Sequence, residues 1–373
     1  MSGTTIKKRD FLAASLGAGI GLAATAAVAQ EGQAGNGGVR AGTRTPGPRP
    51  VNSSVQPSSV DLNYKPRRVN KVIELWEDGQ PAYFVDSGLT PSIDPYAQGV
   101  RMARTWADAI NVEMEHNPLD FVQLCEFMRG LVDGGLTRSG HRTPAVFVET
   151  CIIGLDEAYM RANSWVIEQL LDCGIHGIHI CHARDTKAIQ VASQMAMRYP
   201  FLDRLGVPNL PMRGLRGSSA SYAANIWGIN GGKYCHVADL WPLNPKGELM
   251  FGVKIEDTFA DADAAQTLAL PGIAWAEWGP GDHAYWLYGL SAIPEDGSRP
   301  SDNVEYRPEM NKIRTNVRDL CKKNNVKFQW GGSPDPKDPG YVQTALDFGT
   351  MMFEGNEPGA IIGREHTKRR MPV

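Results

Sequence analysis

The stretch INVEMEHNPLD, at residues 110–120, carries the side chains best suited to chemistry. An alternating run, typical of a β-strand, ends in three titratable residues within four positions, namely Glu113, Glu115 and His116. An Asn-Pro pair then breaks the chain. An imidazole that moves a proton needs a second group to fix its tautomer, and a neighbouring acid can do so. The stretch therefore suggests a base beside its orienting carboxylate.

Further acids stand at the ends of other apolar runs that resemble strands. They are Glu149 in PAVFVE, Glu256 and Asp257 after LMFGVKI, and Glu277 and Asp282 in EWGPGDH. Unpaired carboxylates that lie close together repel, so one takes up a proton or a cation binds among them. Oxygen ligands with few thiols or imidazoles favour Mg²⁺ or Mn²⁺ over Zn²⁺. Each acid alone is more often a helix cap or an ion-pair member, so the metal hypothesis depends on several strand ends lying together.

The elements that must position these residues follow one pattern from Lys71 onward. The candidate strands are 82–87, 109–114, 144–149, 174–181, 249–256, 273–279, 326–332 and 350–356, with helical patterns between them. Strand and helix alternating about eight times predicts a TIM (β/α)8 barrel, the α/β fold whose active sites lie at the carboxyl ends of its strands. A doubly wound open sheet is the alternative, but no Gly-rich dinucleotide fingerprint follows the first strand.

The long segment 201–247 interrupts this alternation. It is rich in Gly, Asn and Ser, and a loop of this length inside a compact domain is usually functional. We expect it to lie over the top face of the barrel as a lid or a substrate wall. The C-terminal run REHTKRR, at 364–370, is expected to be solvated.

Histidines and cysteines give a weaker signal. In HGIHICH, at 176–182, a strand would place His179 and Cys181 on one face and His182 on the other. This arrangement favours buried barrel residues over a zinc site, which needs three or four convergent ligands. None of the six cysteines forms a CxxC pair, and a core of this size does not need disulfides, so we expect free thiols.

The first 62 residues do not look like part of the fold. Residues 1–29 combine the basic run KKRD, an apolar Ala/Gly/Leu run and the small-residue pattern AVAQ, which predicts a cleaved export signal and a periplasmic protein without a membrane span. The signal is twin-arginine-like, and an ordinary secretory signal is the alternative. Residues 30–62 predict a disordered Gly/Pro/Ser linker, which leaves 63–373 for a catalytic barrel. A net charge of −3 with interspersed signs predicts no nucleic-acid partner.

Five motifs resemble those of the HpcH/HpaI-type aldolases, the class II pyruvate aldolases and citrate lyase-like enzymes of the phosphoenolpyruvate/pyruvate barrel superfamily. NVEMEHNPLD is similar to their [I/V]-D-x-E-H element, and QLLDCGIHGIHI to Q-L-L-D-x-G-A-x-x-L-[L/V]-V. RYP with RGLRGSSAS is similar to R-Y-P-P-x-G-x-R-G, GVKIED to V-Q-I-E-T, and EWGPGDHA to F-I-G-P-A-D-L-S. Order and spacing agree from residue 71 to about 360. With its export signal, the chain would be a divergent member.

The resemblance implies a divalent-metal-dependent carbon–carbon lyase that acts on a small 2-oxo or 2-hydroxy acid through a metal-stabilised enolate. Glu256 and Asp282 match the two carboxylates that hold Mg²⁺ or Mn²⁺. His116 matches the base, Glu113 the acid that orients it, and Glu115 the acid that contacts metal-bound water. Family members often assemble through C-terminal helices, which implies a homo-oligomer.

Two positions depart from the family. The family has an Arg at the end of its third strand, but PAVFVETC has Phe147 or Glu149 at that position. The family also has a Gln before the metal-binding Glu, where this sequence has Lys254. Lys254 could replace the Arg as the cation near the enolate, with a changed substrate geometry because Lys is a point charge. Alternatively, Lys254 and Glu149 form an ion pair and the keto-acid site is lost. Lys254, Glu149 and Gly281 are the expected substrate-binding positions.

Three other functions stay open. The same barrel and metal could perform another enolate-type reaction, such as hydrolysis, hydration or decarboxylation. A non-catalytic binding protein for a small acid is the next alternative, but binding alone would not need the base at His116. A metal-free glycosidase with paired carboxylates is the most distant.

Overall fold

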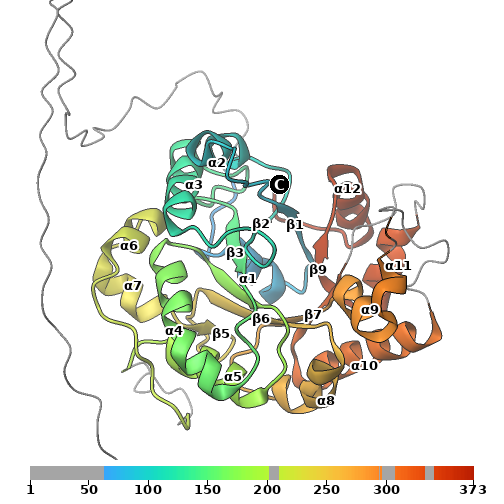
Figure 1. The fold of residues 1–373 in the computed structure, drawn as a ribbon. Helices are drawn as coiled ribbons and strands as arrows, with labels where there is room; N and C mark the ends of the chain where they lie inside the picture. Colours follow the sequence, from blue (N-terminus) through green and yellow to red (C-terminus); the bar gives the residue numbers. More distant parts are fainter. Residues whose placement is uncertain (1–62, 201–209, 294, 296–306, 332–339) are drawn as a thin grey trace, which may run out of the picture. The chain divides into compact units, whose positions relative to one another are not determined.

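Eight parallel strands close into a barrel in the structure, a computed structural model that describes residues 63–200, 210–293, 295, 307–331 and 340–373 (Figure 1). The strands are β1 (Ala82–Asp86), β2 (Ala109–Glu113), β3 (Ala145–Glu149), β4 (Gly177–Ile180), β6 (Leu249–Ile255), β7 (Trp275–Trp278), β8 (Lys327–Trp330) and β9 (Thr350–Glu354). Neighbouring strands pair in parallel, and the β4–β6 and β1–β9 pairs complete the ring. The predicted TIM (β/α)8 barrel and all eight predicted strands are confirmed, and the open sheet is excluded. The predicted export signal and linker lie outside the described residues.

Helices surround the barrel between successive strands (Figure 1). They are α2 (Pro95–Met102), α3 (Phe121–Asp133), α4 (Glu157–Asp172), α5 (Thr186–Val191) with the π-helical η2 (Ala192–Ala196), α8 (Thr258–Thr267), α9 (Pro280–Tyr288) with the 3₁₀ turn η4 (Gly289–Ala292), α10 (Pro308–Asn324), α11 (Tyr341–Phe348) and α12 (Glu357–His366). Five begin at an Asp N-cap whose side chain accepts backbone N–H groups, at Asp94, Asp120, Asp156, Asp185 and Asp257. Several acids at this face are therefore helix caps.

The interior of the barrel is apolar at the amino ends of the strands. Its buried side chains include Phe84, Phe147, Met250 and Trp275, and helix α1 (Lys71–Glu77) packs against them as a plug. Period-two alternation turns Met250, Gly252 and Lys254 of β6 inward, while the residues between them join the outer core under the helices. Because the lower interior is filled, the polar inward residues gather at the carboxyl ends. Helix α1 was not among the elements predicted from the sequence.

The segment 201–247 does not cover the top face over its described part, 210–247, which corrects our prediction. It forms α6 (Ser221–Trp227), α7 (Gly231–Val237) and the short β5 (Leu240–Trp241). The Trp227 indole donates to the carbonyl of Gly174, ahead of β4, and β5 pairs with the amino end of β6. The physical reason is chain direction, because a segment that follows a helix and precedes a strand lies at the amino-terminal face of a barrel.

The C-terminal run is also placed differently from its expected solvated state. The carboxylate of Asp108 is fully buried, and each of its two oxygens accepts a 2.6 Å hydrogen bond from a guanidinium nitrogen of Arg369. The ammonium of Lys71 is 3.0 Å from the same carboxylate, and Arg364 is 3.6 Å away. Burial opposes ionisation, but these cations hold the pKa of Asp108 far below its usual value. The network fastens the C-terminus beneath the barrel.

The remaining expectations concern thiols and membrane spans. All six cysteines are free, as predicted, and Cys173, Cys181 and Cys321 are buried. Within the described part of the chain, no helix has the length and apolarity to cross a membrane.

Candidate active site

A buried ammonium surrounded by carboxylates occupies the carboxyl end of the barrel. Lys254 Nζ lies 3.1 Å from Glu115 Oε2, 3.4 Å from Glu256 Oε2 and 3.7 Å from Glu149 Oε1. The Lys254 side chain is only 10% exposed. Burial alone would lower its pKa, but Cys181 and the carboxylates raise it well above the usual value. Lys254 is therefore a fixed positive charge, and the predicted pairing with Glu149 is one of three such contacts.

The carboxylates around Lys254 outnumber the positive charge. Burial raises the pKa of Glu256 to about 7, with the charge of Glu115 adding to the shift and Lys254 opposing it. Burial likewise raises the pKa of Glu277 well above its usual value. In contrast, Lys254 and His179 overcome the effect of burial on Glu149 and hold its pKa at about 2. The raised pKa values of Glu256 and Glu277 are thus due first to burial, and the neighbouring acids that share one ammonium add to them.

His182 enters this site from the turn after β4. Its Nδ1 lies 2.6 Å from Asp257 Oδ2, and the same oxygen accepts a 2.7 Å hydrogen bond from Arg184 Nε. Its Nε2 lies 3.4 Å from Glu115 Oε1. Burial would lower the pKa of His182, but the hydrogen bond to Asp257 raises it. The ring is thus held between an orienting carboxylate and a second acid.

The predicted base, His116, stands at the rim of the site. Its side chain is 66% exposed, and its Nδ1 lies 3.3 Å from Glu113 Oε1 and 4.0 Å from Glu115 Oε2. The backbone N–H of His116 donates to Glu113 Oε1 at 2.6 Å, and the amide of Asn117 donates to the other oxygen. Glu113 therefore fixes the turn that carries His116, and Glu115 points inward toward Lys254.

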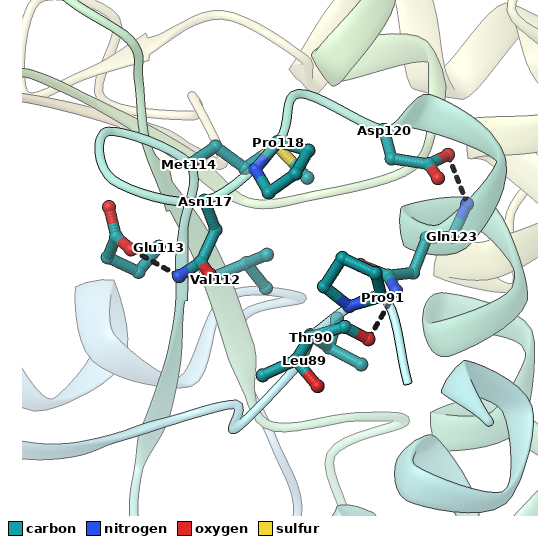
Figure 2. Close-up of a pocket in the computed structure, with 10 residues that line it drawn as sticks. All are labelled: Leu89, Thr90, Pro91, Val112, Glu113, Met114, Asn117, Pro118, Asp120 and Gln123. Atoms are coloured by element: carbon teal, nitrogen blue, oxygen red, sulfur yellow. Dashed lines mark hydrogen bonds between the residues drawn. The ribbon is translucent and has the colours of Figure 1, made fainter. Parts of the chain in front are cut away.

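A small cavity adjoins Glu113 between the loops that follow β1 and β2 (Figure 2). Figure 2 shows Glu113 hydrogen-bonded to Asn117 on one side of the cavity, and Gln123 hydrogen-bonded to Thr90 and Asp120 on the other. Its volume of about 20 Å³ holds roughly one water molecule. The cavity is too small for an organic acid.

Among the residues that the structure describes, three groups of side chains present potential metal ligands within 4.8 Å of one another. They are Glu115–His182–Asp282, Glu115–Cys181–Glu256 and Glu149–His179–Glu277. The predicted pair, Glu256 and Asp282, does not share a group, but Glu115 belongs to the groups of both. Glu115 Oε1 is buried without a hydrogen-bond partner, as are both ring nitrogens of His179.

Gly279 packs directly against Glu256. A Cβ on Gly279 would lie 2.6 Å from Glu256 Oε2, so only glycine allows this close approach. By contrast, a Cβ on the predicted substrate-binding residue Gly281 would meet nothing within 4 Å. Gly281 is exposed at the start of α9 and leaves open space beside Asp282.

Sequence reasoning missed His182 and its partner Asp257 as functional residues. Strand alternation predicted that His182 points away from the barrel, but β4 ends at Ile180 and His182 has a φ of +50°. This turn re-aims the side chain, so the period of two no longer applies. The available signal was the density of histidines next to a strand end.

The fold and the position of this cluster define a class, the (β/α)8 barrels with polar sites at the carboxyl ends of their strands. An HpcH/HpaI aldolase from Desulfitobacterium hafniense DCB-2 has the same fold, with a TM-score of 0.53, 16% identity, and coverage of 79% of this chain and 93% of that chain. An HpcH/HpaI aldolase/citrate lyase family protein from Burkholderia cenocepacia J2315 has a TM-score of 0.54 and 16% identity, and the match covers 80% of this chain and 96% of that chain. Macrophomate synthase has a TM-score of 0.52 and 16% identity, and the match covers 83% of this chain and 92% of that chain.

No protein-family model and no curated protein sequence matches the chain. The solved structures nevertheless confirm, at the level of fold, the resemblance inferred from five motifs. The chain shares its fold with HpcH/HpaI aldolases and macrophomate synthase.

Proposed function

We propose that this chain is a divalent-metal-dependent carbon–carbon lyase that acts on a small 2-oxo or 2-hydroxy acid. The imbalance of charge at the carboxyl end of the barrel carries the proposal. Four buried or nearly buried carboxylates, those of Glu115, Glu149, Glu256 and Glu277, accompany the single ammonium of Lys254. A divalent cation fits this donor set because it would neutralise the excess charge and engage the orphaned Glu115 Oε1.

When bound, a divalent cation supplies positive charge that stabilises negative charge on a substrate oxygen. The chain's own residues provide the rest of the chemistry. Lys254 stays protonated among its acids, so it is a poor amine nucleophile. Phe147 and Trp275 close the floor beneath Lys254 and exclude water from below. His116, held by Glu113 at the rim, is positioned to exchange a proton with a ligand that enters from solvent.

A second candidate keeps the barrel and the metal but changes the reaction to another enolate-type conversion, such as decarboxylation, hydration or hydrolysis. It is favoured by the ion pairs of Lys254, which already engage Glu115, Glu149 and Glu256. An ammonium tied to three acids presents a different field to a keto acid than a bidentate Arg would.

The test combines metal content with binding of oxalate, an enolate mimic. Metal-free full-length chain would be loaded with Mn²⁺, and oxalate affinity measured by calorimetry for wild type, Glu256→Ala and the exposed control Glu357→Ala. We expect Mn²⁺-dependent oxalate binding in wild type and the control, and at least a tenfold loss in Glu256→Ala. Metal binding without oxalate binding would favour the second candidate. Absence of metal binding in wild type would refute both.

A further inference from the structure

We propose that His182 is a metal ligand together with Glu115 and Asp282, and that Asp257 and Arg184 are positioning residues that orient its ring. The inference rests on the proposed function, because it concerns the metal of the same site. It replaces an all-carboxylate site at Glu256 and Asp282 with a site of one imidazole and two carboxylates.

The first argument is the convergence of donor atoms. One donor from each of Glu115, His182 and Asp282 lies within 4.8 Å of the others. The Glu115 side chain is 2% exposed, yet its Oε1 has no hydrogen-bond partner. That oxygen lies 3.4 Å from His182 Nε2, beyond the usual length of a hydrogen bond. Two ligands at metal-bond length from one cation lie about 3.0–3.4 Å apart, so the spacing suits a shared ion.

The second argument is the tautomer of His182. Its Nδ1 is 2.6 Å from Asp257 Oδ2, and a carboxylate there requires that Nδ1 carry the proton. The Nε2 lone pair is then free to bind a cation beside Glu115 Oε1. Arg184 Nε donates to the same Asp257 oxygen, while Asp257 Oδ1 accepts from the backbone at the start of α8. A carboxylate that holds the remote nitrogen of an imidazole is the usual partner of a histidine ligand.

The third argument is that Glu256 is already engaged. Its Oε1 accepts from the backbone N–H of His182 at 2.9 Å, and its Oε2 faces the Lys254 ammonium at 3.4 Å. The residue it holds, His182, has a φ of +50°, a conformation that costs energy for a residue with a Cβ. Glu256 therefore fixes the strained backbone that aims the His182 ring, whereas Glu115 keeps an oxygen available.

The consequence is a preference among cations. Imidazole is a ligand for the later first-row metals, whereas Mg²⁺ takes oxygen donors and water. With one nitrogen ligand, this site should favour Mn²⁺ over Mg²⁺. Loss of the imidazole should therefore weaken Mn²⁺ more than Mg²⁺.

Pulsed electron paramagnetic resonance of the full chain loaded with Mn²⁺ tests the inference without an activity assay. Wild type should show the ¹⁴N modulation of a coordinated imidazole. His182→Gln should lose that modulation and bind Mn²⁺ at least tenfold more weakly, while the control His366→Gln, on α12, should match wild type. Glu256→Gln should keep the modulation. Asp257→Asn should also keep it but weaken Mn²⁺ affinity about tenfold, as loss of an outer partner does.

The outcomes separate this inference from the proposed function. Mn²⁺ bound in wild type without ¹⁴N modulation would overturn the histidine ligand and leave a metal-dependent function intact. Modulation that persists in His182→Gln would assign another histidine and also overturn the inference. If wild type bound no Mn²⁺, the proposed function itself would fail. Because the wild-type spectrum decides the first outcome, the test does not depend on whether any variant folds.

Discussion

Replacing Lys254 by Met should expose the charge imbalance of the site as a loss of stability. The ammonium lies 3.1, 3.4 and 3.7 Å from oxygens of Glu115, Glu256 and Glu149. At an effective dielectric constant of about 20, each contact has a gross energy of about 5 kcal/mol. The cost of desolvating the ions offsets most of this sum. Removing one partner of a buried ion cluster typically costs about 3–5 kcal/mol, because the other charges stay buried and uncompensated.

The assay is thermal unfolding of metal-free protein by circular dichroism across pH. For a domain of about 300 residues, a loss of about 3–5 kcal/mol in the free energy of unfolding corresponds to a Tm decrease of roughly 5–8 °C. Without Lys254, the acids have raised pKa values in the folded state, so the folded protein binds more protons than the unfolded chain. The penalty should therefore be large at pH 8 and should shrink as the pH falls toward 5.

A double variant provides the matched control. Adding Glu149→Gln to Lys254→Met removes one of the repelling charges, so it should recover part of the lost stability at pH 8. Saturating Mn²⁺ should recover stability as well, since it replaces one cation by another. A penalty that is the same at pH 5 and pH 8, and unchanged by Glu149→Gln, would refute the electrostatic reasoning and leave packing as the cause.

Three further predictions concern other parts of the fold and site. Asp108→Asn should lower the free energy of unfolding, measured with urea, by about 3–5 kcal/mol, because it leaves Arg and Lys side chains buried without their carboxylate. The control Asp319→Asn, at an exposed position, should change it by no more than about 0.5 kcal/mol. Hydrogen bonds from His141 and Tyr64 overcome burial and lower the pKa of Glu74 to about 2, so about 3 kcal/mol of stability should be lost as the pH falls from 4.5 toward 2. Glu74→Gln should flatten that slope in unfolding measured at several pH values. Gly279→Ala should weaken Mn²⁺-dependent oxalate binding about tenfold by displacing the adjacent carboxylate, whereas Gly281→Ala, with open space around its Cβ, should fold as wild type.

The barrel could be predicted from the sequence because the apolar runs and the helix-start signals indicated the same order of strands and helices. Apolar runs of strand length are followed by Asp residues that cap the next helix, as at Asp120 and Asp257, so each helix start is marked in the sequence. The ends of parallel strands meet on one face, which is why acids from distant segments, such as Glu115 and Glu256, could be expected to lie together.

The remaining features depended on tertiary contacts that local patterns do not encode. Helix α1 fills the amino end of the barrel, and its role follows from the cavity that inward side chains such as Phe84 leave there. The position of 210–247 followed from chain direction, not composition. His182 was misassigned because one residue with a positive φ changes the face on which a side chain lies. A period is informative only while the strand continues.

The same residues explain why a barrel with this fold could tolerate a lysine in place of the expected glutamine. An ammonium next to a divalent cation is repelled unless further acids screen it. Here Glu149 stands at the end of β3 and lies 3.7 Å from Lys254 Nζ. The two side chains thus carry complementary charges, an acid on β3 and a cation on β6. Reversing both, with Glu149→Arg and Lys254→Gln in one protein, should therefore be better tolerated than either change alone, because each single change leaves an unmatched buried charge.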